Sequence, residues 1–184
     1  MKKKFLFLLL MQIVLISCQK KVSDFRLISY DVESGNQLKI NAYSSLDKDG
    51  VLNVYLDRER DKVFYKYKLS ESELDQINSL SKNKLENYVA KRALDQNQGY
   101  AGSRNFISLK VNGKEDKLCF ILPFMNSKFS KVIDSLEAKI YQQDESSVTE
   151  KFPIDFKNVE KEIMNQNQVD NYLPSKQLPP PPMR

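Results

Sequence analysis

The chain has 184 residues, with 29 Lys or Arg against 24 Asp or Glu, and a formal net charge of +5. Its start contributes Lys2, Lys3 and Lys4 without an acid, and removing these three charges from +5 leaves +2. Beyond that start no basic block is longer than Lys20-Lys21, which argues against nucleic-acid binding, because that function needs a clustered basic face. The absence of histidine excludes Ser-His-Asp and Cys-His catalysis and removes the commonest metal ligand.

The first eighteen residues are typical of an export signal. Lysines at positions 2–4 precede an apolar run over residues 5–16, which is shorter than the roughly 20 residues that span a membrane. A basic start, a short apolar run and a small residue at the cut are the marks of a secretory signal peptide. The motif Leu15-Ile16-Ser17-Cys18 also resembles the lipobox of bacterial lipoproteins, of the kind found in Bacteroidota.

This resemblance implies that residues 1–17 are removed and that Cys18 becomes the mature N-terminus, carrying acyl chains such as palmitate. Two or more acyl chains hold a protein stably at a membrane, whereas one chain binds only marginally. The sequence therefore predicts a lipid-anchored protein of the cell membrane. By the same resemblance, Gln19 in place of an aspartate favours the outer membrane, in either a periplasmic or a surface orientation. The alternative is an ordinary cleaved signal that leaves Cys18 unmodified.

After a tether over residues 18–24, a single domain is predicted over residues 25–143. Its first half alternates apolar and polar residues between turns at 34–36, 46–50 and 57–62, which predicts antiparallel strands. The apolar sets expected to share a face are Ile28, Tyr30 and Val32; Leu38, Ile40 and Ala42; Leu52, Val54 and Leu56; and Val63, Tyr65, Tyr67 and Leu69. The segment 47–50 resembles the start of a calcium loop, but Arg58 stands where the closing glutamate belongs, so we expect a turn.

Two main helices are predicted next. Ser70 and Glu73 fit a capping box, in which the hydroxyl and the carboxylate each bond a free backbone N–H at the helix start. A shorter helical piece is expected over residues 85–94, and a loop over 96–104. The second main helix carries an apolar stripe at helical spacing, formed by Phe129, Val132, Ile133, Leu136 and Ile140.

A hairpin is predicted between the two helices, because Asn112-Gly113 separates two alternating runs. A two-residue loop pairs Val111 with Lys114, and a four-residue loop pairs Leu109 with Leu118. We favour the longer loop because it places apolar residues opposite apolar residues. Both registers keep the same side chains on the same face of the sheet.

Together these elements predict an α+β fold: a two-layer antiparallel sheet of about six strands, with two main helices on one face and water on the other. Residues 144–184 are polar and end in four consecutive prolines, so we expect a mostly disordered tail. Within it Phe156, Val159 and Ile163 have the spacing of one short helix.

Two surfaces are candidates for interaction. The solvent face of the sheet carries Tyr55, Phe64, Lys66 and Lys68, and aromatic residues are common anchors at interfaces. The loop over residues 99–104 carries Tyr100 and Arg104 between glycines. Cys119, the remaining thiol once Cys18 is modified, lies in an apolar stretch and is expected in the core.

The sequence therefore predicts a non-enzymatic binding or accessory module of the cell envelope, without cofactor, metal or nucleic acid. Its partners are the membrane, through Cys18, and an envelope protein or glycan that the sequence does not identify. The whole arrangement resembles small α+β lipoproteins of Bacteroidota families without an assigned activity, so the resemblance implies no reaction. The alternatives are a lipid-anchored hydrolase that uses paired carboxylates, and an inhibitor of an envelope-directed effector.

Overall fold

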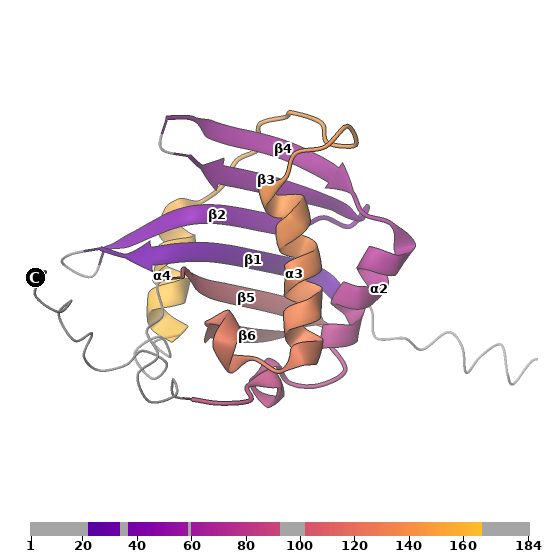
Figure 1. The fold of residues 1–184 in the computed structure, drawn as a ribbon, viewed down its shortest axis with the longest axis vertical. Coiled ribbons are helices and arrows are strands. Elements are labelled where there is room, and N and C mark those ends of the chain that lie inside the picture. The colour runs from indigo at the N-terminus through magenta and orange to yellow at the C-terminus, as the bar shows by residue number, and fades with distance from the viewer. Residues whose placement is uncertain (1–21, 34–36, 59, 93–101, 167–184) are drawn as a thin grey trace, which may run out of the picture.

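The computed structural model describes residues 22–33, 37–58, 60–92 and 102–166, so Cys18, Tyr100 and residues 167–184 lie outside the described residues. Six strands form one antiparallel sheet in the order β4-β3-β2-β1-β5-β6 (Figure 1). The strands are β1 (Val22–Val32), β2 (Leu38–Leu46), β3 (Val51–Asp57), β4 (Lys62–Lys68), β5 (Arg104–Val111) and β6 (Lys114–Phe120). The helices are α2 (Glu71–Leu80), α3 (Ser127–Tyr141) and α4 (Phe156–Gln166), with short 3₁₀ turns at Leu85–Tyr88 and Leu122–Phe124. The predicted α+β class and six-stranded antiparallel sheet are confirmed.

The main core lies between the sheet and the helices α2 and α3, which cover one face (Figure 1). The capping box at the start of α2 is present, with the Ser70 hydroxyl accepting from the Glu73 N–H and the Glu73 carboxylate accepting from the Ser70 N–H. All five residues of the predicted α3 stripe are buried. The Tyr67 hydroxyl fixes the end of α3 against β4 by donating to the Gln142 carbonyl at 2.5 Å. Of the helical piece expected over 85–94, the described residues 85–92 form a 3₁₀ turn at Leu85–Tyr88 and no further helix.

A bulge changes which residues of β2 face this core. Ser29 pairs with Ala42 and Tyr30 pairs with Ile40, so Asn41 is an extra residue on β2. Because one extra residue reverses the alternation, Ile40 packs on one side of the sheet and Ala42 on the other. The prediction that Leu38, Ile40 and Ala42 share a face is therefore wrong for Ala42.

The β5–β6 hairpin adopts the shorter of the two predicted loops. Val111 pairs with Lys114, and Asn112 and Gly113 both have positive φ, 50° and 76°. Two residues with positive φ form the type I′ turn, whose twist matches that of the flanking strands. Turn geometry thus outweighed apolar pairing, and the favoured four-residue loop is wrong. The side-chain faces are as predicted, since Leu118 packs in the main core.

The second face of the sheet is covered by the chain's own C-terminal segment rather than by water. Helix α4 crosses behind the sheet (Figure 1) and buries Val159 and Ile163 against β1, β5 and β6. The residues that it covers include Ile28, Tyr30, Ile40, Phe106 and Cys119. The prediction of a mostly disordered tail is therefore wrong for residues 144–166, because these apolar groups form a second core. The short helix at Phe156, Val159 and Ile163 is confirmed.

Strand β1 begins at Val22, within the segment 18–24 that was expected to be a tether. Val22 is the first residue of β1, pairs with Val111 and is 7 % exposed. Its N–H donates to Asn78 Oδ1 at 2.9 Å, which joins the start of β1 to α2. Residues 22–24 therefore belong to the domain rather than to a tether.

Candidate functional site

The predicted interaction face around Tyr55 is occupied by the chain itself. Tyr55 is 3 % exposed, and its ring lies 5.1 Å from Phe64 and 5.0 Å from Phe156. Phe64 in turn contacts Phe152 edge-on at 5.5 Å. Such aromatic pairs favour tilted and edge-to-face geometry. These rings therefore fasten residues 152–156 to β3 and β4 and are not free to bind a partner.

The two lysines of that prediction have separate roles. Lys66 exchanges both backbone hydrogen bonds with Val148, and its Nζ lies 2.9 Å from Glu150. Residue 148 thus adds a short bridge to the outer edge of β4 and covers part of an otherwise open strand. Lys68 is the last residue of β4, at the opposite end of the strand from Lys62. It is exposed, and its Nζ donates to the carbonyl of Asp49.

The remaining predicted residues do not join this group. Tyr100 lies outside the described residues. Arg104 is half-buried at the start of β5, where it pairs with Tyr30, and three strands separate β5 from β4. Its Nε is buried without a hydrogen-bond partner among the described residues. Among the five of these residues that the structure describes, Arg104 lies apart from the other four.

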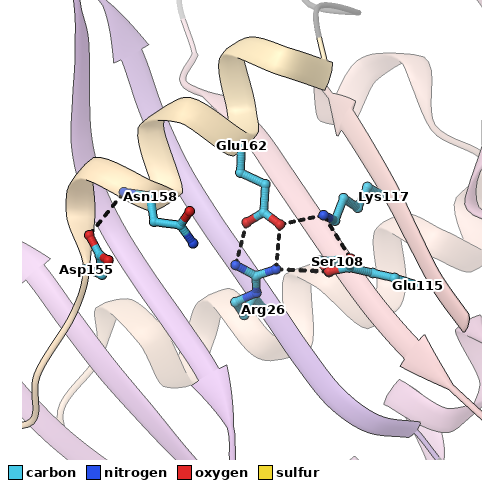
Figure 2. Close-up of polar contacts among 7 residues, drawn as sticks. All are labelled: Arg26, Ser108, Glu115, Lys117, Asp155, Asn158 and Glu162. Atoms are coloured by element: carbon cyan, nitrogen blue, oxygen red, sulfur yellow. Dashed lines mark hydrogen bonds and ion pairs between the residues drawn. The ribbon is translucent and has the colours of Figure 1, made fainter. Parts of the chain in front are cut away.

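A cluster of charged residues, which we name the α4 cluster, lies between the sheet and α4 instead (Figure 2). It consists of Arg26, Ser108, Glu115, Lys117 and Glu162. Arg26 pairs with Ser108 and Ser108 with Lys117 in the strand register, so these three residues form one row across β1, β5 and β6. Helix α4 supplies Glu162 from above this row.

In the α4 cluster, two cations contact the carboxylate of Glu162. Arg26 Nη1 and Nη2 donate to the two oxygens of Glu162 at 2.6 and 3.1 Å. Arg26 Nη2 also lies 3.1 Å from Glu115, and Lys117 Nζ bridges Glu115 and Glu162. Only 15 % of the Arg26 side chain and 19 % of the Glu162 side chain are exposed. A bidentate Arg–carboxylate pair combines strength with fixed orientation, so this contact sets how α4 docks.

The ionisation of the α4 cluster does not favour proton transfer. Burial alone would raise the pKa of Glu162, but hydrogen bonds from Arg26 and Lys117 outweigh burial and hold that pKa below its ordinary value. The pKa of Glu115 is also lowered, because hydrogen bonds from Lys117 and Ser108 outweigh its desolvation. A general acid in a glycan hydrolase needs a raised pKa. Both carboxylates therefore behave as permanent acceptors for the two cations.

Helix α4 also has a local reason to begin where it does. The Asp155 carboxylate accepts from the Asn158 N–H at 3.1 Å (Figure 2), which satisfies one of the free donors in the first turn. The apolar spacing of Phe156, Val159 and Ile163 was visible in the sequence, but their contact with β1 was not. Residues so distant in the sequence leave no local pattern of their contact, since Arg26 and Glu162 are 136 positions apart.

Surface pockets lie at the end of the sheet where β1 begins. A pocket of about 700 Å³ is lined by the 81–84 loop after α2 and by the tip of the β5–β6 hairpin. A smaller pocket of about 310 Å³ lies on the other side of Val22, between the 46–50 turn and α2. Small-molecule sites have volumes of about 300–1,000 Å³. Both pockets lie at the same end of the sheet as Val22.

Cys119 lies in the second core, as predicted, and is 0 % exposed. Burial raises the pKa of its thiol to about 11. A thiol with a raised pKa is a poor nucleophile, because the thiolate is the reactive form. The side chain therefore acts as a small apolar group.

Among the described residues, no group of three or more Cys, Asp or Glu side chains is arranged to hold a metal ion. No helix in the same ranges is long and apolar enough to cross a membrane.

Comparison with known proteins adds no family to this geometry. No protein-family model matches the chain, and no curated protein matches it.

Proposed function

We propose that this chain is a lipid-anchored, non-enzymatic binding module of a bacterial cell envelope. The observation that carries the proposal is the position of Val22, which is buried at the start of a central strand only four residues after the lipobox cysteine. A folded domain that starts so soon after Cys18 needs no further segment to reach the membrane. The resemblance of residues 15–18 to a lipobox supplies the anchor, and two or more acyl chains make it stable.

The charged residues of the α4 cluster give little support to acid catalysis. Arg26, Glu115, Lys117 and Glu162 neutralise one another, and the pKa values of both carboxylates are lowered. The carboxyl of Glu137 has a raised pKa through burial and the neighbouring Asp134, but it lines neither of the pockets at the Val22 end. The hydrolase alternative therefore has less support than a binding module.

The test is the location and mass of the mature protein. In cells, the wild-type chain should sediment with membranes, whereas Cys18→Ala should appear in the soluble fraction. Intact-mass analysis of the membrane form should show a diacylated or triacylated Cys18. An unmodified thiol at the first residue of a membrane-bound mature chain would refute the anchor.

The binding role needs a separate experiment. Crosslinking in intact envelopes, followed by capture of the acylated protein, should recover the same partner repeatedly from the wild type. A variant that has lost the fold, such as Ile133→Asp in the main core, serves as the control for non-specific capture. Release of sugars from purified envelope glycan by the wild type, abolished by Glu162→Gln, would instead favour the hydrolase.

A further inference from the structure

The length of chain between Cys18 and Val22 limits how far the domain stands from its membrane. Four residues reach at most about 14 Å when fully extended, at roughly 3.5 Å each. The end of the domain where β1 begins must therefore lie close to the lipid headgroups, given the proposed anchor. We name this end the Val22 edge; it contains Val22, the 46–50 turn, the 81–84 loop and the tip of the β5–β6 hairpin.

The Val22 edge is rich in exposed cations around the larger pocket. Lys82 and Lys84 flank it on the loop after α2, and Lys114 flanks it on the hairpin. All three are exposed, and within the described ranges none of them forms an ion pair. The sequence adds Lys20 and Lys21 directly before Val22.

The acids that line the same pocket cancel only part of this charge. Glu115 is held by Arg26 and Lys117 in the α4 cluster. The Asp116 carboxylate accepts the N–H of Leu85 at 2.7 Å and keeps its negative charge, so it offsets one of the three lysines. On the other side of Val22, the 47–50 turn carries two acids and one lysine, and Lys68 donates to its Asp49 carbonyl. The charges there balance, so the net basic charge lies at the larger pocket.

We propose that the Lys82–Lys84–Lys114 pocket docks on the phosphate headgroups of the leaflet that holds the acyl chains of Cys18. This inference rests on the proposed lipid anchor. Charge complementarity selects the occupant, because anionic lipid surfaces attract lysines near a membrane anchor and the attraction fades within a Debye length. A pocket of about 700 Å³ also offers room for a headgroup between the loop and the hairpin. The domain then has a defined orientation instead of rotating freely on its tether.

The first experiment measures orientation with the acylated mature chain in vesicles of phosphatidylglycerol and phosphatidylcholine. A fluorophore on Asn83→Cys reports the Val22 edge, and one on Asp61→Cys reports the opposite edge, at the turn between β3 and β4. Cys119 is fully buried and does not compete for label. With nitroxide-labelled headgroups, quenching should be strong at position 83 and weak at position 61.

The lysines are tested by a triple variant with a charge-matched control. Lys82→Gln, Lys84→Gln and Lys114→Gln together should lower quenching at position 83, although the short tether still keeps that position nearer to the headgroups than position 61. The control variant replaces Lys39, Lys62 and Lys157 by glutamine. These lysines are exposed and lie away from the Val22 edge, so the control should keep the wild-type pattern of quenching. Equal quenching at both edges in the wild type, or no effect of the first triple variant, would overturn the inference.

The second experiment removes the anchor and measures the lysines alone. The mature chain with Cys18→Ser should partition into phosphatidylglycerol vesicles and not into phosphatidylcholine vesicles. Each lysine removed from the pocket should lower partitioning by about fivefold, whereas the control lysines should have little effect. If the acylated chain binds vesicles but shows no preferred edge and no lysine dependence, the docking inference fails while the anchor stands. If the mature chain carries no acyl group, both proposals fail.

Discussion

Replacing Glu162 by glutamine is the sharpest test of how α4 is held. The Glu162 carboxylate contacts both Arg26 and Lys117, and their side chains are 19, 15 and 24 % exposed respectively. Removing one partner of a fully buried ion pair costs about 3–5 kcal/mol, whereas an exposed pair contributes about 0–1 kcal/mol. The cluster lies between these limits and Arg26 keeps Glu115, so we expect Glu162→Gln to lower the free energy of unfolding by about 2–3 kcal/mol.

The assay is urea denaturation followed by circular dichroism, with amide hydrogen exchange in α4 as a local probe. Glu160→Gln is the matched control, because Glu160 lies on the same helix and forms no ion pair among the described residues. The control should stay within about 0.5 kcal/mol of the wild type. If α4 opens separately from the main core, the loss should appear as faster exchange of its amides. Equal effects of the two substitutions, or no effect of Glu162→Gln on either readout, would refute the role of Glu162 in holding α4 on the sheet.

Other outcomes follow from the same structure. The pKa of Glu162 is lower in the folded chain than its ordinary value of 4.5. Its contribution to the free energy of unfolding should therefore be fully present above pH 4.5 and lost as the pH falls through the folded pKa. In the Glu162→Gln variant, the free energy of unfolding should fall less steeply with decreasing pH. Ile163→Ala should cost about 2–5 kcal/mol in urea denaturation, whereas Met164→Ala, at a side chain 54 % exposed, should be nearly neutral. Gly113→Ala should lower the free energy of unfolding by roughly 1–2 kcal/mol. The cause is the backbone φ of +76°, since an added methyl group would meet no other atom. An unchanged stability would contradict the type I′ turn. Cys119 should react with a thiol reagent only after unfolding, and rapid labelling of the native chain would show that the second core is open.

Local patterns predicted the elements that depend on local chemistry. The Ser70–Glu73 capping box and the α3 stripe involve residues three to four positions apart, so neighbouring residues decide them. The hairpin register also had a local solution, because Asn112-Gly113 specifies its own turn. Apolar pairing favours the longer loop, but the turn preference of Asn112-Gly113 outweighs it and sets the register.

The predicted interaction site failed because it depended on what covers the sheet. Tyr55 and Phe64 do lie on the face opposite α2 and α3, as the alternation indicates. Whether that face meets solvent, however, is decided by residues 148–156, about 90 positions later in the chain. The exposure of a surface predicted from one strand therefore depends on which distant segments of the chain pack on it.

The composition of the central strands nevertheless contained the missing signal. Residues 27, 28 and 30 of β1 are all apolar and all buried, and residues 106 and 107 of β5 repeat the pattern. A strand that is apolar on both faces must be covered on both faces. Helices α2 and α3 both pack on one face, so a further apolar element was required for the other. In the sequence after α3, the segment with that spacing was Phe156, Val159 and Ile163, and its place on the sheet follows from the need to cover β1.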